Sequence, residues 1–509
     1  MTLNLNRHIH RLSFWFILFF ISLTILCLPT LMIPFAHHDD LSYFDHHPKL
    51  FTKYPYHDIN FSIGRYTAAY FGSILSWFIY RIDDLKWIRL FNIVQLSLAG
   101  ALIVQTVNRW IKQPFQTFLI TLTLFSLPPF QIFIAYSGIA CFFPAIWLSL
   151  AAAVMVWDIP TQRPFHKRLR HKKAIGSCLL FLCAITTYPS AAMLFWGVSL
   201  GFYLIHLQTK KRDLHLILLH VFISGISCIA IYAGLIKIIG KHFLNTITTT
   251  SLYNPYSITT DFWGKLTWFF KEPLFNVTNF WNIFPNVYIY GISILFILGA
   301  CFLRVKNTIR KKPLTSDNML QFYILPVTTI IAFTILSYLP NLLATGQAPW
   351  YRCSVGLTTS IFCLMIWSGY VYFSYFLSAK HSLPKILLSV LCLTGSYSAC
   401  QTMVIHRVIP SCMETQKIIT SINRAHQSNK TFNHIHFIVP YRDNKRIRYD
   451  EFGVLSSQYS FNIPSLINLA YKELNLDQSI KPKDMRYSSS LPGQISQFSP
   501  KILVIDLSR

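Results

Sequence analysis

Charged residues, and acidic residues above all, are scarce in this sequence. Only 13% of the 509 residues are charged, and 19 acidic residues stand against 45 lysines and arginines. A soluble domain is about one quarter charged, so the composition argues against a soluble protein of this length. The 11 cysteines contain no CxxC pair, and most lie inside apolar runs, which indicates packing rather than redox or zinc chemistry.

The sequence is instead rich in long apolar runs. Hydrophobic residues make up 53% of the chain, and its mean hydropathy is +0.42. Several runs reach the ~20 apolar residues that cross a bilayer. The first run is too long for the apolar region of a signal peptide, so we expect it to be retained. About eleven transmembrane helices are predicted, at residues 12–34, 88–108, 115–134, 139–157, 174–189, 191–207, 214–239, 286–303, 320–339, 353–376 and 385–405.

The net charge of +26 does not indicate nucleic-acid binding in this chain. The basic residues cluster in short connectors between apolar runs, which is the positive-inside pattern of membrane proteins. Residues 66–80 would break the alternation of helices if they crossed the membrane, and about fifteen residues are few for a ~30 Å hydrocarbon core. We predict a helix along the outer surface there, although the sequence also allows a short span. The connectors expected to face the cytoplasm are residues 163–173, 210–212, 304–312 and 380–385.

This alternation divides the chain into two parts. Residues 1–405 form the transmembrane domain, and residues 406–509 form an outer tail with 8 of the 19 acidic residues. The predicted fold class is an all-α polytopic membrane protein with a small extramembrane α/β appendage. The tail has two β-like runs and one helical stretch, at residues 434–440, 501–507 and 464–474. The predicted outer loops of the transmembrane domain are residues 35–87, 240–285 and 340–352.

The first outer loop concentrates the acidic residues. Asp39, Asp40, Asp45 and Asp58 are four of the eleven that precede the tail. Asp39 and Asp40 follow the first predicted helix directly, at the membrane surface, where a carboxylate can reach a sugar linked to a lipid phosphate. Sugar transfer from such a donor needs a base for the acceptor hydroxyl and cations for the departing phosphate. The alternative is a solvated acidic loop.

An acidic pair just after the first transmembrane helix resembles the GT-C superfamily of glycosyltransferases. The pair followed by Gly64-Arg65 and a surface helix resembles more narrowly the bacterial O-antigen glucosyltransferases of the GtrII type. Their Gly-Arg-Pro-Leu motif lacks its proline here, and their Tyr-Gln motif is matched loosely by Tyr188-Pro189. A late outer-face arginine is matched by Arg352. The resemblance spans residues 1–405 and is specific only over the first hundred.

The resemblance implies roles for particular residues. Asp39 or Asp40 would be the general base, with the other carboxylate orienting the base or the acceptor. The substrate-binding candidates are Arg65 and Arg352 for the lipid phosphate, Tyr188 in the cavity, Asp58 of the acidic loop and Trp263 under the sugar. The alternatives are an interfacial role for Arg352, packing for Tyr188 and membrane anchoring for Trp263.

The histidines of the first outer loop raise the question of a metal. His37 and His38 with Asp45 could supply nitrogen and oxygen ligands, but no HExxH or similar spacing supports a site. We therefore expect no required cofactor, and Mg²⁺ or Mn²⁺ remains open because branches of the superfamily differ in metal use.

These features predict a multi-pass glycosyltransferase of the bacterial inner membrane with a periplasmic active face. It would move a hexose such as glucose from a polyprenyl-phosphate donor to a surface glycan such as lipopolysaccharide O-antigen or to a lipid-linked acceptor. Membrane lipids, a flippase and a donor-synthesising enzyme would be its partners. The alternatives are an O-antigen polymerase or ligase, for which the late outer loop is short, and a lipid-linked glycan flippase or transporter. Transporters carry ionisable residues inside their spans, whereas here Lys237 lies near a span end and almost no other charge lies inside one.

Overall fold

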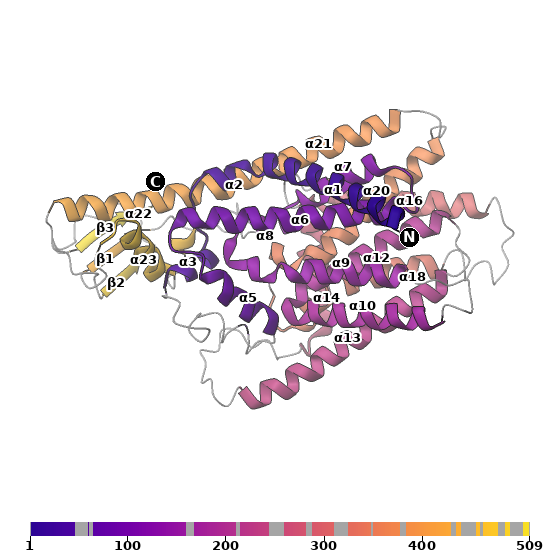
Figure 1. Ribbon diagram of the computed structural model, residues 1–509, viewed down its shortest axis with the longest axis horizontal. Helices are drawn as coiled ribbons and strands as arrows, with labels where there is room; N and C mark the ends of the chain where they lie inside the picture. The colour runs from indigo at the N-terminus through magenta and orange to yellow at the C-terminus, as the bar shows by residue number, and fades with distance from the viewer. Residues whose placement is uncertain are drawn as a thin grey trace.

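The computed structural model of the chain is mostly helical (Figure 1). In the part of the chain that the structure describes, seven helical segments are long and apolar enough to cross a membrane, or eight if one bent pair counts as a span. The chain is therefore a membrane protein, and eleven spans remain a prediction. The described residues are 2–45, 60, 65–158, 167–209, 214–243, 259–280, 283, 288–309, 324–347, 350–376, 383–428, 434–438, 455–458, 462–476, 484–488 and 502–507.

The first half of the chain alternates long helices with short ones. Its elements are α1 (Thr2–Leu26), α2 (Leu28–Met32), α3 (His38–Asp45), α5 (Tyr66–Ser76), η1 (Ile82–Asp84), α6 (Leu85–Val107), α7 (Pro114–Phe125), α8 (Pro128–Ala135), η2 (Ser137–Phe142), α9 (Pro144–Trp157), α10 (Lys167–Thr187), α11 (Pro189–Ala192), α12 (Leu194–Thr209) and α13 (Leu214–Phe243). Prolines begin α7, α8, α9 and α11, where a missing N–H costs no hydrogen bond.

The second half ends in a small sheet. Its elements are α14 (Phe262–Lys271), α15 (Pro273–Thr278), α16 (Tyr288–Ile309), α18 (Leu325–Leu336), α19 (Leu339–Leu343), η7 (Tyr351–Cys353), α20 (Val355–Phe376), α21 (Leu383–Met403), η8 (Val404–Val408), α22 (Ile409–Gln427), β1 (His434–Ile438), η9 (Ser456–Gln458), α23 (Ile463–Glu473), β2 (Asp484–Ser488) and β3 (Ile502–Asp506). The strands are parallel, in the order β2-β1-β3, with His434 opposite both Asp484 and Ile502.

One predicted span differs from the helices of the structure. The predicted continuous helix at residues 115–134 is broken between α7 and α8, which are bent by 70°. Leu127 has an extended backbone, and Pro128 with Pro129 then starts the new helix, because proline cannot continue the old one. The short helix α5 is not among the candidate spans, which agrees with the prediction that residues 66–80 do not cross the membrane. Its 11 residues would cover only ~16 Å.

One long helical rod connects the membrane part to the sheet. The segment Leu383–Gln427 runs through α21, η8 and α22 for 45 residues. At 1.5 Å per residue it is roughly 68 Å long, more than twice the ~30 Å hydrocarbon core, so it must extend out of a membrane that it crosses. The sheet and α23 lie beside the α22 end of this rod, next to α3 (Figure 1).

The buried apolar side chains form two cores. The larger one lies between the long helices and includes Phe19, Phe133 and Trp196. The second core joins α3 and the start of α6 to α22, α23 and the sheet, and it includes Leu41, Phe44 and Ile467. The C-terminal elements therefore share a core with the segment that carries the acidic pair.

Candidate functional site

Asp39 and Arg352 meet although they are 313 residues apart in the sequence. Nη1 of Arg352 donates to Oδ2 of Asp39 at 2.6 Å. The two side chains keep 17% and 13% exposure, so the pair is reachable from outside. Asp39 lies in the first turn of α3, and Arg352 lies in η7 just before α20 begins. The structure thus brings a predicted base and a predicted phosphate ligand into direct contact.

Asp40 lies in a different environment from Asp39. Its side chain is completely buried and accepts hydrogen bonds from the backbone N–H of His37 at 2.9 Å and of Gly138 at 2.6 Å. Its Oδ2 also lies 3.4 Å from Nη2 of Arg89. Burial raises the pKa of Asp40 to about 7, against the attraction of Arg89 and the Gly138 N–H. The hydrogen bonds of Asp40 hold α3 in place. Its carboxylate is buried, so it cannot contact the hydroxyl of a sugar acceptor.

The guanidinium of Arg89 bonds both to Asp40 and to the loop before α3. It lies in the second turn of α6 and is 1% exposed. Besides Asp40, it donates to three backbone carbonyls, of Thr30 at 3.2 Å, Phe35 at 2.7 Å and Ala135 at 2.9 Å. These bonds tie α2, the loop before α3 and the end of α8 to α6. The guanidinium would keep three acceptors even if Asp40 were neutral.

Gly138 lets η2 lie directly against the acidic pair. A Cβ at this position would come within 2.3 Å of the backbone oxygen of Asp39 and 2.9 Å of its Cβ. Real side chains do not approach a backbone so closely, so only glycine fits without a shift of α3 or η2. The same residue donates its N–H to Asp40. Gly138 therefore sets the position of α3 relative to η2.

Arg65 and Tyr188 also come together. The guanidinium of Arg65 lies 4.7 Å from the ring centre of Tyr188 and 5.1 Å from that of Phe142, and the two rings stack at 4.4 Å. None of the described acidic residues forms an ion pair with Arg65. Aromatic faces hold a guanidinium without using its N–H donors, which stay available for an anion.

The turn that carries Arg352 is anchored to the Tyr188 side of the site. The Tyr188 hydroxyl lies 3.5 Å from Sγ of Cys353, next to Arg352. Nδ2 of Asn341 donates to the Cys353 carbonyl at 3.1 Å, and Oγ of Ser190 donates to Oδ1 of Asn341 at 3.4 Å. The Arg352 guanidinium lies 4.8 Å from the ring of Trp350. These contacts join α11, α19 and η7 around the two arginines.

A buried aromatic stack lies behind Asp39. His37 stacks on Tyr136 with ring centres 3.6 Å apart, and Arg407 lies 4.9 Å from the Tyr136 ring. Nδ1 of His37 accepts from the Asp39 N–H at 3.4 Å and is 4.0 Å from Oδ2 of Asp39. His37 therefore supports the backbone of Asp39 from inside the protein.

The structure does not place the other predicted site residues in this cluster. Asp58 lies outside the described residues, as do the side chains of His38 and Asp45. Trp263 is 74% exposed on α14, and in the described part of the chain its one ring contact is with Phe262. Trp263 makes no ring contact with the described residues of the cluster, and its place under the sugar stays a prediction. Among the residues described, no group of three or more His, Cys, Asp or Glu side chains could hold a metal ion.

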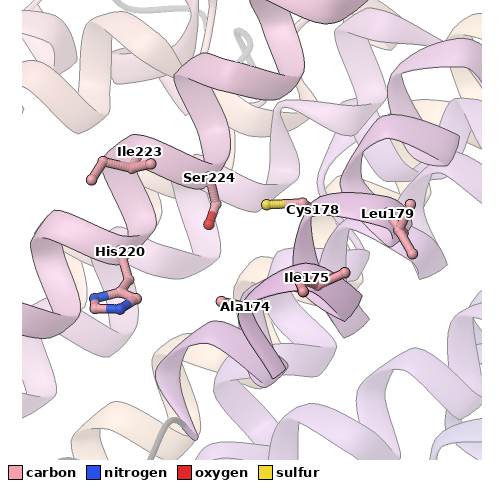
Figure 2. A pocket seen from close by; sticks show the side chains of 7 residues that line it. All are labelled: Ala174, Ile175, Cys178, Leu179, His220, Ile223 and Ser224. Carbon is pink, nitrogen blue, oxygen red and sulfur yellow. The ribbon is translucent and has the colours of Figure 1, made fainter. Parts of the chain in front are cut away.

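A separate hollow of about 320 Å³ lies between α10 and α13 and contains none of the predicted site residues. Figure 2 shows that side chains from both helices line it. Its lining is mostly apolar, and polar side-chain atoms come from Cys178, His220 and Ser224. The full lining is Ala174, Ile175, Cys178, Leu179, His220, Ile223 and Ser224. The hollow is therefore not part of the acidic and basic cluster.

The sequence reasoning missed Arg89 and Gly138. The sequence predicts spans that are almost free of charge, but Arg89 is the second residue of the predicted span 88–108. Arg407 lies two residues beyond the predicted span 385–405 and is buried in the long rod. An arginine at the start of an apolar run was the available signal, because a buried charge there needs partners. The need for a glycine at position 138 comes from its contact with Asp39, 99 residues away, and a lone glycine in a sequence does not reveal such a contact.

The cluster has to be interpreted from its own geometry. No protein-family model, curated protein or solved structure matches this chain.

Proposed function

We propose that this protein is a membrane glycosyltransferase that moves a hexose such as glucose from a polyprenyl-phosphate donor to a hydroxyl of a surface glycan such as O-antigen. The reaction would take place at the periplasmic face of the bacterial inner membrane. Asp39 is the general base, and Arg352 and Arg65 bind the donor phosphate. This is the GT-C type of reaction, in the GtrII-like form that the sequence resembles.

One observation carries the proposal: a partly exposed corner of the protein combines a reachable carboxylate with two guanidiniums. Asp39 touches Arg352 at 2.6 Å, and Arg65 lies on the ring of Tyr188, whose hydroxyl reaches the residue after Arg352. A base and phosphate-binding cations are the two things that the transfer needs. The burial of Asp40 leaves Asp39 as the carboxylate for proton transfer.

The ends of the helices support an outer location for this corner. The site residues lie at the end of α10 and at the beginnings of α6, α9, α11 and α20, which fall on one side if the helices alternate. The basic residues lie at the other ends: Lys173 near the start of α10 and Arg109 after α6 both pair with Asp158 after α9. By the positive-inside rule the basic side faces the cytoplasm, and the acidic corner faces outward.

The proposed step balances without a cofactor. The acceptor oxygen attacks the anomeric carbon of the sugar, the bond from that carbon to the phosphate oxygen breaks, and Asp39 takes the acceptor proton. The polyprenyl phosphate leaves as an anion that Arg352 and Arg65 stabilise. A carboxylate paired with a guanidinium is a weaker base than a free one. Because the donor phosphate competes with Asp39 for Arg352, donor binding would free the base.

Gene deletion with complementation tests this function. Surface glycans of the deletion strain are compared by mass spectrometry with those of strains that express the wild type, Asp39→Asn or Asp83→Asn. Asp83 is an exposed acid of η1 and serves as the matched control. We expect a hexose to disappear on deletion and to return with the wild type and Asp83→Asn but not with Asp39→Asn.

The same strains separate the alternatives. If Asp39→Asn restores the sugar fully, Asp39 is not the base. If deletion changes no surface glycan, the protein is not this glycosyltransferase. A flippase would instead leave the lipid-linked intermediate on the inner leaflet, and a polymerase would shorten the glycan chains without removing a sugar from the repeat.

A further inference from the structure

Two consecutive residues of α23 hold two separate parts of the N-terminal half. Nζ of Lys472 donates to the backbone oxygen of Phe44, near the C-terminus of α3, and lies 5.8 Å from the Phe44 ring. Oε1 of Glu473 accepts from the Ile82 N–H at 2.9 Å, and its Oε2 lies 3.6 Å from Arg81. Ile82 begins η1, which leads directly into α6.

The apolar face of α23 supports the same two parts. Leu466, Ile467 and Ala470 of α23 are almost fully buried in one core with Leu41 and Phe44 of α3. The start of α6 contributes Leu85 and Ile88 to this core. Figure 1 shows α3 lying beside α23, away from the middle of the long helices. The acidic helix thus packs on the C-terminal elements as well as on η2.

α3 needs such support because it is short. A helix of eight residues is unstable alone in water, and its last carbonyls have no partner within the helix. A lysine at the C-terminal end satisfies one of these carbonyls and interacts favourably with the helix dipole. Lys472 occupies this position for α3, while Glu473 caps the N–H that opens η1. Both contacts lie more than 390 residues away in the sequence.

The two parts that α23 holds are the two that fix the acidic pair. α3 carries Asp39 and Asp40, and α6 carries Arg89, the partner of Asp40. We propose that Lys472 and Glu473 are positioning residues of the site: together they clamp α3 to the start of α6 and hold Asp39 against Arg352. The effect on sugar transfer rests on the proposed function, whereas the clamp itself does not.

Hydrogen exchange of the full-length protein in lipid nanodiscs tests the clamp directly. We compare the wild type with Lys472→Met, Glu473→Gln and the control Arg424→Met, which removes an exposed cation of α22 in the same unit. We expect the amides of α3 to exchange roughly tenfold faster in Lys472→Met, because a charged hydrogen bond is lost. Exchange in α20 should not change, and Lys472→Arg should restore slow exchange in α3.

The outcomes decide between a clamp and a plain structural contact. Unchanged exchange of α3 in both Lys472→Met and Glu473→Gln would overturn the clamp. If Lys472→Met unfolds the whole protein, the amides of α20 also exchange faster. The exchange of α3 in Lys472→Arg and Glu473→Gln then decides whether the clamp exists. These readouts need no activity, so they stand even if the glycosyltransferase proposal fails.

Complementation of the deletion strain then tests the positioning role. At equal protein levels we expect Lys472→Met to lower the sugar content of surface glycans several-fold and Lys472→Arg to restore it. Arg424→Met should behave as the wild type. If α3 exchanges faster in Lys472→Met but the sugar content stays at the wild-type level, the clamp has no catalytic role.

Discussion

Arg352 closes a salt bridge of 2.6 Å onto Asp39, and the two residues come from opposite ends of the membrane part of the chain. This contact gives Arg352 two expected roles: it holds the base before the donor arrives, and it binds the phosphate afterwards. Arginine suits the second role because its fork binds phosphate through two parallel hydrogen bonds, whereas lysine offers a single point charge.

The dual role predicts a graded loss of activity. We expect Arg352→Met to lower sugar transfer about a hundredfold, as removal of one charge-stabilising donor does in other enzymes. Arg352→Lys should retain part of the activity because it keeps the charge. Glycan sugar content in the complemented deletion strain measures both. Lys271→Met, which removes an exposed lysine of α14, is the control and should have no effect. Equal activity of Arg352→Met and wild type would remove Arg352 from the site.

The close approach of η2 to α3 predicts that Gly138 tolerates no side chain. In Gly138→Ala the new methyl group would meet the Asp39 backbone oxygen at 2.3 Å, so α3 or η2 must move. Overpacking of this kind costs about 1–3 kcal/mol. We expect a lower melting temperature and loss of sugar transfer.

Gly291→Ala is the matched control for this prediction. Gly291 lies in α16, and a Cβ there would meet no atom within 4 Å. Alanine also favours a helix over glycine, so this variant should melt at or slightly above the wild-type temperature. Should both variants melt alike, the contact between η2 and α3 would not be as tight as the distances indicate.

Local patterns in the sequence predict the membrane class, and the resemblance to GT-C glycosyltransferases points to four of the residues that meet at the site. These four are Asp39, Arg65, Tyr188 and Arg352, and contacts in the structure connect them. The apolar runs also coincide with helices, because hydropathy is a local property that indicates which segments lie in lipid. The roles of these residues stay predictions.

Other features depend on contacts between distant segments, which no local pattern contains. The difference between Asp39 and Asp40 comes from Arg89 and Gly138, 49 and 98 residues from Asp40. Pro128 and Pro129 are a sequence signal for the break between α7 and α8. The apolar run continues across both prolines, so hydropathy alone predicts one unbroken span there. The contact of α23 with α3 joins the two ends of the chain, and its residues are ordinary in composition.

The buried pair of Asp40 and Arg89 predicts an unusual dependence of stability on pH. The folded protein raises the pKa of Asp40 to about 7, above the value of about 3.9 for an unfolded chain. The folded state therefore binds this proton more tightly than the unfolded state does. Its contribution to stability is full below about pH 4 and declines as the pH rises to about 7.

Comparison with Asp40→Asn isolates this effect, because asparagine does not titrate. The melting temperature of the wild type minus that of Asp40→Asn should fall from about pH 5 to about pH 7 and then level off. Arg89→Met should destabilise the protein by about 3–5 kcal/mol at any pH in this range, since it leaves three buried carbonyls without their donor. A difference that is flat with pH would show that folding leaves the pKa of Asp40 near its unfolded value.

The stacking of Arg65 on Tyr188 predicts that the ring matters more than the hydroxyl for donor binding. Tyr188→Phe keeps the aromatic face 4.7 Å from the Arg65 guanidinium and loses only the contact with Cys353, so it should retain most of the activity. Tyr188→Leu removes the face, which is worth about 0.5–2 kcal/mol to a guanidinium, and should weaken donor binding up to about thirtyfold. Titration of isolated membranes with a polyprenyl-phosphate glucose measures the change as a shift in half-saturation. If Tyr188→Phe is as impaired as Tyr188→Leu, the hydroxyl and its link to the Arg352 turn are what the site requires.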